Sequence, residues 1–203
     1  ARTRSPSGQG LGNLIGTGGG HIISQTMEQI ESLPQNETVQ AEVALALRDN
    51  PNDAWALGLR GELALQRGDE LSAYRDLKLA LSLKPEPRTR DLLRSSLLEG
   101  LRVDFAKFKS SQSDIEALLD TPEQRSRYYQ LLGRGWEQAG EWQAAFSAYL
   151  KLVNPTLKPE GLEVVETARS VRRGRLVQTR TGDIYARADA ANRADMDREV
   201  RQF

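Results

Sequence analysis

The chain repeats a pattern of small and apolar residues at a fixed interval, and this repetition constrains the fold more than any other feature. The pattern Ala-Leu-x-x-x-Pro occurs at 46–51 and again 34 residues later at 80–85. Val43 and Leu77 are related by the same interval. A second interval of 72 residues relates Gly61, Gly68 and Ala73 to Gly133, Gly140 and Ala145. The sequence therefore predicts recurring units of similar structure.

Local signals predict that the first unit is a helical hairpin. Asp53 can cap a helix that begins at Ala54, and Gly68 can supply the left-handed residue that ends it. Asp69 can then cap a second helix that runs to about Leu83. Small residues at the shared positions would let the two helices of the hairpin approach closely.

A second hairpin is predicted from residue 121 onward. Residues 121–124, Thr-Pro-Glu-Gln, have the spacing of a capping box with proline at the first helical position. Pro155 would end the second helix. Bulky residues that can fill the space around the small ones are Leu132, Trp136, Trp142, Phe146 and Tyr149.

The register of these positions resembles the tetratricopeptide repeat (TPR), a helix-turn-helix unit of 34 residues. The second copy departs from the family pattern by carrying Leu152 where a small residue is usual and by placing its proline two residues early. The resemblance implies an all-α fold, a TPR-like α-solenoid of helical hairpins over residues 36–159. The matching positions are Gly61, Ala64, Gly68, Ala73, Leu77, Ala80 and Pro85, then Leu132, Gly133, Trp136, Gly140, Ala145 and Tyr149.

Two regions around the clear copies are less regular. Residues 88–120 predict a long amphipathic helix followed by a shorter one, and here the repeat spacing is lost. The long helix would run through Leu93, Leu97, Leu101, Phe105 and Phe108. Residues 160–203 predict one or two C-terminal capping helices with a thin apolar face, broken near 181–183.

The N-terminal region differs from the rest in composition. Residues 1–20 are rich in Gly, Ser and Arg, which predicts a flexible tail. Residues 21–35 predict a short extended or β segment, since Ile22 and Ile23 follow glycines. This segment looks like the closing hairpin of a β-propeller blade. The whole arrangement is similar to bacterial proteins that combine pyrroloquinoline-quinone (PQQ)-type propeller repeats with a TPR segment.

The propeller resemblance implies a context for the chain. The chain begins at Ala1 and not at Met, so we expect it to be part of a longer protein. If the propeller resemblance holds, the compartment would be the periplasm or cell envelope, and otherwise the cytoplasm. Any quinone chemistry would belong to propeller blades outside this chain.

Charge and composition argue against several partner classes. Lys and Arg total 28 and Asp and Glu total 28, so no field of one sign would steer the chain to nucleic acid. No apolar run reaches the roughly 20 residues that span a bilayer, so no membrane insertion is expected. Cysteine is absent, which excludes thiol nucleophiles and thiolate metal sites.

No candidate for catalysis, cofactor binding or metal binding emerges. The glycines of 8–20 lack the spacing of a phosphate-binding loop, which favours a linker. His21 is the only histidine and has no partner at a recognisable spacing, so it cannot form a multi-histidine metal site. Glu137 and Glu141 share one helix face, which indicates a solvated surface. We therefore expect a protein that is not an enzyme and has no cofactor.

Two clusters leave functional alternatives open. The arginines at 169, 172, 173, 175 and 180 predict a solvated or internally paired helix, with contact to an acidic partner as the alternative. Trp136 and Trp142 fall on repeat core positions, whereas Trp55 is a candidate anchor for a partner.

The resemblance implies recognition of a protein or peptide on the concave face lined by the first helices of the hairpins. The Lys/Asn set that clamps a C-terminal carboxylate in chaperone-binding TPR proteins is not reproduced. The alternative is a structural helical spacer within a larger PQQ-type propeller protein, with the groove filled intramolecularly by 160–203 and the flanking propeller as partner. The implied groove residues are Trp55, Glu62, Leu65, Gln66, Arg127, Gln130, Arg134, Glu137 and Gln138.

Overall fold

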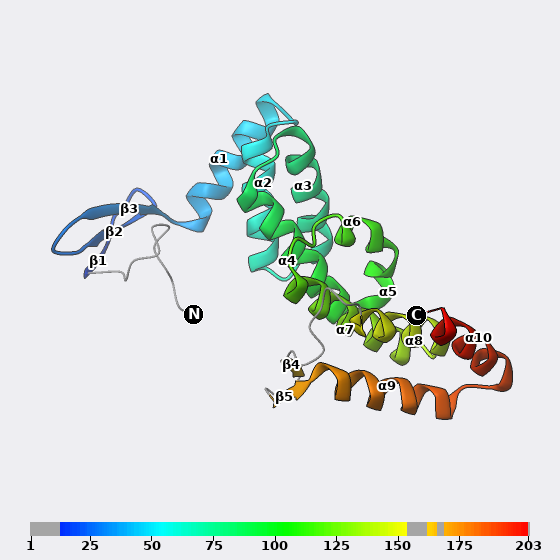
Figure 1. Ribbon diagram of the computed structural model, residues 1–203. Helices are drawn as coiled ribbons and strands as arrows, with labels where there is room; N and C mark the ends of the chain where they lie inside the picture. The colour runs from blue at the N-terminus through cyan, green and yellow to red at the C-terminus, as the bar shows by residue number, and fades with distance from the viewer. Residues whose placement is uncertain (1–12, 154–161, 166–168, 203) are drawn as a thin grey trace. The chain divides into compact units, whose positions relative to one another are not determined.

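The computed structural model describes residues 13–153, 162–165 and 169–202, which are mostly helical (Figure 1). The chain divides into two compact units, and the boundary between Leu93 and Arg94 falls within helix α4 (Pro87–Val103). No helix in the described ranges is both long and apolar enough to cross a membrane. The mostly helical class predicted from the sequence is confirmed, together with a small sheet near the N-terminus.

Three short antiparallel strands precede the helices, in the order β1-β2-β3. Their bounds are β1 Asn13–Gly16, β2 His21–Gln25 and β3 Ile30–Pro34. Strands β2 and β3 form the extended segment predicted at 21–35. Strand β1 was not predicted, because its residues fall inside the expected tail. Leu14 and Ile15 pair with Ser24 and Ile23 of β2, and this non-local partner supplies the ordering. Residues 1–12 of the predicted tail lie outside the described residues.

The 34-residue interval of the sequence recurs in the helix bounds of the N-terminal unit. Helix α1 spans Asn36–Asp49 and α3 spans Glu70–Leu83, so both ends differ by 34 residues. Their C-caps, Asn50 and Lys84, have nearly the same backbone angles, φ −140 ψ 99 and φ −142 ψ 104. Between them lies α2 (Ala54–Gln66).

The hairpin α2–α3 forms by the predicted local signals. The Asp53 carboxylate accepts a hydrogen bond from the Ala56 amide, and that of Asp69 accepts one from the Ser72 amide. Gly68 connects the helices at φ 73, a left-handed conformation that glycine adopts without steric cost. Gly61 allows the helices to approach closely, since a Cβ there would lie 2.7 Å from Leu77 Cγ.

Helices α7 (Pro122–Gln138) and α8 (Trp142–Leu150) form a second hairpin with the same geometry 72 residues later. Helix α2 ends at 66 and α7 at 138, while α3 begins at 70 and α8 at 142. Gly140 repeats the left-handed turn at φ 75, and a Cβ at Gly133 would lie 2.8 Å from the Tyr149 ring. The predicted capping box at Thr121 and Gln124 is present.

The predicted end of the second hairpin falls partly outside the described residues. After α8 the chain continues as a short 3-10 helix, η2 (Lys151–Val153). Pro155, expected to end the helix, lies outside the described residues.

The region between the hairpins differs from the prediction of one long helix through Phe108. Helix α4 ends at Val103, and α5 (Phe105–Phe108), η1 (Lys109–Ser111) and α6 (Gln112–Glu116) follow. Asp104 interrupts the helix because its side chain accepts a hydrogen bond from the Lys107 amide and caps a new helix. Phe105 and Phe108 keep the apolar spacing across this break, so periodicity alone does not reveal it.

The C-terminal region also differs from the prediction. A two-stranded sheet, β4 (Leu162–Val165) with β5 (Arg169–Arg172), precedes the helices expected throughout 160–203. Helix α9 (Arg173–Arg187) runs through the predicted break at 181–183, where the Thr181 hydroxyl donates to the Val177 carbonyl. The break occurs at Ala188, and Asp189 caps α10 (Ala190–Arg201).

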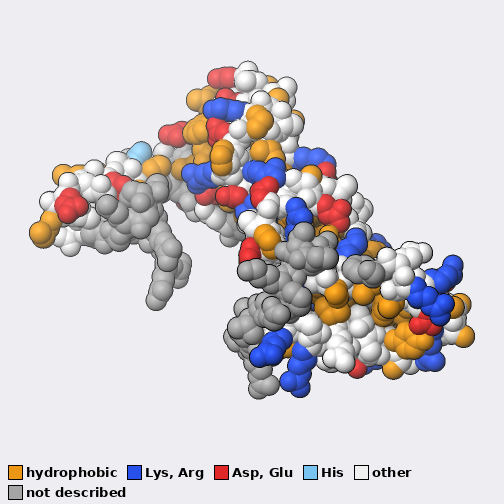
Figure 2. All heavy atoms as spheres, in the orientation of Figure 1, with side chains coloured by type: hydrophobic (Ala, Val, Ile, Leu, Met, Phe, Trp, Pro, Cys, Tyr) orange, Lys and Arg blue, Asp and Glu red, His pale blue; other side chains and the backbone are white. Residues whose placement is uncertain are grey.

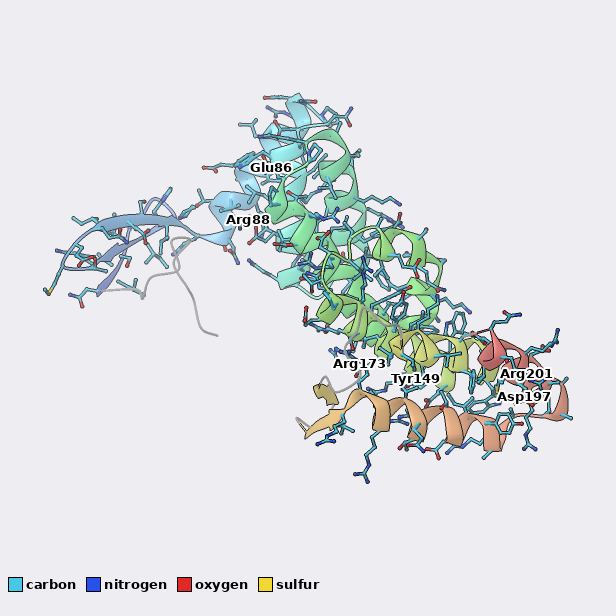
Figure 3. All side chains as sticks on the ribbon, viewed as in Figure 1. Glu86, Arg88, Tyr149, Arg173, Asp197 and Arg201 are labelled. Carbon is cyan, nitrogen blue, oxygen red and sulfur yellow. The ribbon has the colours of Figure 1, made fainter. Side chains whose placement is uncertain are left out.

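Helices α9 and α10 pack against α8 through an apolar cluster (Figure 1). Ile184 and Met196 are fully enclosed in it, although the flanking sequence is polar. Its buried members are Ala145, Phe146, Tyr149, Leu150, Leu152, Leu176, Val177, Ile184, Ala188 and Met196. The Tyr185 hydroxyl also donates to the Asp197 carboxylate over 3.3 Å, which joins α9 to α10 (Figure 3).

We expect Tyr128→Phe to raise the free energy of unfolding by about 1 kcal/mol, because a buried polar group without a partner is costly. Tyr128 is 0% exposed, and its hydroxyl has no hydrogen-bond partner among the described residues. Burial also raises the pKa of this hydroxyl well above its usual value. Urea unfolding would measure the gain. The matched control Tyr185→Phe removes a hydroxyl that is hydrogen-bonded, so it should lose stability. An equal loss in both variants would contradict the prediction.

Candidate interaction surface

An open pocket of about 460 Å³ lies between α4 and α7 in the C-terminal unit. Its lining carries charges of both signs around one apolar side chain, Leu98. The residues are Arg94, Ser95, Leu98 and Glu99 from α4 and Glu123, Gln124 and Arg127 from α7. The pocket therefore offers both donors and acceptors to a ligand.

The carboxylates of this pocket are held in the ionised form by their neighbours. Arg102 donates two hydrogen bonds to Glu99, at 2.9 and 2.5 Å, and they lower the pKa of Glu99, with smaller contributions from the charges of Arg102 and Arg127. The pKa of Glu123 is lowered by its own backbone amide and by Thr121 at the start of α7. Both groups thus remain acceptors for cationic ligand groups over the physiological pH range.

The arginines of the pocket differ in how firmly they are held. Arg94 lies 3.7 Å from the Asp120 carboxylate, and its side chain is largely enclosed. Arg127 is exposed. Arg127 is therefore the cation best placed to change partners when a ligand binds.

The predicted groove residues of α7 divide into two groups. Arg127 lines the pocket, whereas Gln130, half-buried, donates to Ser126 over 3.4 Å. Glu137 lies 3.6 Å from Arg180 of α9. Burial raises the pKa of Tyr149, and the nearby Glu137 carboxylate adds to the rise. Glu137 is thus engaged by the C-terminal helices.

The remaining α7 positions show no common surface. Arg134 is half-buried and has interactions of its own, while Gln138 is exposed at the end of the helix. Of the predicted α7 set, the pocket includes Arg127 alone.

The predicted groove residues of α2 belong to the N-terminal unit. Trp55 is 57% exposed. Glu62 accepts two hydrogen bonds from Arg88 at the start of α4, at 2.7 and 2.9 Å (Figure 3). Leu65 is half-buried, and Gln66 accepts a weak bond from Asn36 at 3.4 Å. Glu62 is therefore already paired, which leaves Trp55 as the large exposed side chain of this set.

Most residues of the α4–α7 pocket were not predicted. Arg94, Ser95 and Glu99 lie on α4, where the repeat register is lost, so no sequence position marked them. Glu123 and Gln124 were recognised as capping residues only. The signal that could have found them is their place in the first turn of α7, two turns or less from Arg127.

The arginine cluster of the C-terminal region is partly paired within the fold. Arg173 is 7% exposed at the start of α9 (Figure 3), and Arg180 pairs with Glu137. Arg172 and Arg175 are exposed. The side chain of Arg169 lies outside the described residues. These contacts agree with an internally paired helix for two of the five arginines.

The tryptophans at predicted core positions pack as expected. Trp136 and Phe105 form an edge-to-face pair with centroids 4.9 Å apart. Trp142 packs against the apolar cluster of α8–α10.

His21 has a hydroxyl partner that the sequence did not reveal. Its Nδ1 lies 3.1 Å from Ser32 Oγ, because antiparallel pairing places both on one face of the sheet. The contact is exposed, so it does not provide the closed pocket that nucleophilic catalysis needs. Among the described residues, His, Asp and Glu also form no group of three or more suited to a metal ion.

Comparison of the chain with protein-family models, curated proteins and solved structures found no significant match.

Proposed function

We propose that the chain is a TPR-like helical scaffold that binds a peptide in the pocket between α4 and α7. The shared 34- and 72-residue intervals in helix bounds, caps and glycine contacts support stacking of hairpins as a solenoid. In such a stack the first helices of successive hairpins line one face. The observation that carries the proposal is an open pocket between two of these first helices, with Arg127 at its edge.

The pocket chemistry favours a peptide with side chains of both charges. Glu99 and Glu123 can accept from Lys or Arg of a ligand, while Arg127 can donate to a carboxylate. Because these groups surround an open pocket, solvent screens their interactions. We therefore expect moderate affinity, with selectivity from the order of charges along the peptide.

We expect Arg127→Glu to weaken peptide binding about tenfold, since it replaces attraction by repulsion at the edge of the pocket. A random peptide library would be selected on the wild-type protein, and the enriched peptides would be synthesised with a fluorescent label. Anisotropy titrations would then give Kd for each variant. Arg175→Glu is the matched control, because it reverses the charge of an exposed arginine on α9. Equal Kd values for wild type and Arg127→Glu would refute the assignment of the pocket.

A structural spacer within a larger PQQ-type propeller protein is the second candidate. Leu14 and Ile15 are 54% and 56% exposed and, as neighbours in a strand, point to opposite faces of the sheet. Apolar groups on both faces of a small sheet are suited to burial between further sheets. The pairing of Glu137 with Arg180 also supports partial filling of the groove from within. A spacer predicts that the library selection enriches no peptide.

A further inference from the structure

A second open pocket, of about 450 Å³, lies between α1 and α2 in the N-terminal unit. Its floor is apolar, and its remaining lining consists of three arginines and one glutamine, with no carboxylate. Gln40, Val43, Ala44, Leu47 and Arg48 come from α1, and Arg60, Leu63 and Arg67 come from α2. In Figure 2, hydrophobic and cationic side chains lie next to each other over these helices.

The C-terminal unit shows what occupies the corresponding side of a first helix. Leu63 of α2 corresponds to Gly135 of α7 by the 72-residue interval. At Gly135 the ring of Phe105 lies so close that an added Cβ would be 2.0 Å from it. That ring also packs edge-to-face on Trp136. In α7 this side is therefore filled by an aromatic ring, whereas in α2 it opens into the pocket beside Leu63.

The arginines of this pocket are not equally available. Arg60 donates two hydrogen bonds to Asp76 of α3, at 2.6 and 2.7 Å, so its charge is largely compensated. Arg48 has only a loose pair with Asp49, 3.6 Å apart, and both side chains are well exposed. Such a surface pair contributes little. Arg67 is exposed at the C-cap of α2. Arg48 and Arg67 thus leave positive charge next to an apolar floor.

We propose that the α1–α2 pocket binds an acidic segment of a partner protein that carries one aromatic anchor. The ring would rest on Val43, Leu47 and Leu63, and flanking carboxylates would pair with Arg48 and Arg67. This surface is separate from the α4–α7 pocket, so the two sites can be tested independently.

The probe is a labelled peptide with a central Phe and Glu on both sides, titrated by fluorescence anisotropy against the whole chain. Arg48→Gln combined with Arg67→Gln should weaken its binding about tenfold, and high salt should weaken it similarly. Ala44→Trp should also weaken binding, because the indole would fill the pocket. Replacing Phe by Ala in the peptide should have the same effect. Arg75→Gln, which removes an exposed arginine of α3, is the matched control and should leave Kd within about twofold.

Several results would overturn the proposal. The first is a wild-type protein that does not bind the acidic peptide, and the second is equal binding of a peptide with Lys in place of Glu. Unchanged Kd in the double arginine variant, whose folding circular dichroism would verify, would do the same. Arg127→Glu must leave the affinity unchanged, since a loss there would place the peptide in the α4–α7 pocket. Failure of the library selection at that pocket would not affect this outcome.

Discussion

Replacing Ile184 by alanine is expected to lower the free energy of unfolding of the C-terminal unit by about 3 kcal/mol, as for other buried aliphatic residues truncated to alanine. Ile184 is 2% exposed on α9 and belongs to the cluster that includes Phe146 and Tyr149 of α8 and Met196 of α10. The truncation would leave a cavity where three helices meet. It should therefore weaken the attachment of both C-terminal helices.

Urea unfolding followed by tryptophan fluorescence would measure this loss, because Trp136 and Trp142 pack against the same cluster. Val200→Ala is the control, since Val200 is 50% exposed on α10 and its truncation should change stability by no more than about 0.5 kcal/mol. If the two variants were equally stable, α9 would not be packed on α8 in solution.

The attachment of α9 bears on both functional proposals. Arg180 reaches Glu137 only while α9 stays packed, so one predicted groove position is occupied from within the fold. Arg127, more than two turns away along α7, lies in the open pocket. A peptide that binds at Arg127 therefore does not need to displace α9. This separation allows a structural role for α9 and a binding role for the start of α7 in the same unit.

The hairpins could be predicted because their signals are local and stereochemical. Gly68 and Gly140 have positive φ, which other residues rarely adopt, and Asp53 and Asp69 cap the helices that follow them. Gly61 also lies against Leu77, as the small residue at that position indicated. These requirements involve neighbours in the sequence or in one hairpin.

The regions that were predicted wrongly depend on competing or distant partners. The break after Val103 arises because Asp104 caps a new helix, although Phe105 and Phe108 continue the helical spacing. Strands β1, β4 and β5 are four residues each, and their pairing partners cannot be recognised from so short a pattern. Met196 was missed as a core residue because α10 is otherwise polar.

The candidate site could be predicted only in part for the same reason. Arg127 belongs to a helix with clear repeat register, so its exposed position next to the preceding first helix could be inferred. Arg94 and Glu99 face it from α4, where the register is lost. The α1–α2 pocket depends on what is missing beside Leu63, and the sequence does not record a space. A pocket thus requires the packing of both helices, not the pattern of either.

Gly135→Ala is expected to destabilise the C-terminal unit by about 2 kcal/mol, although alanine is the better helix former. The new Cβ would lie 2.0, 2.3 and 2.4 Å from atoms of the Phe105 ring. A rigid ring cannot yield by a small rotation, so it must move away and lose its edge-to-face contact with Trp136. The steric cost therefore exceeds the gain of about 1 kcal/mol in helix propensity.

Gly182→Ala provides the matched comparison, because it makes the same change within α9 where no atom lies within 4 Å of the added Cβ. It should raise the free energy of unfolding by about 0.5 to 1 kcal/mol through helix propensity alone. Urea unfolding of both variants would therefore give effects of opposite sign. A gain for Gly135→Ala would show that Phe105 does not lie against α7. It would also remove the comparison from which an aromatic anchor was inferred for the pocket beside Leu63, since that inference depends on the ring at Gly135.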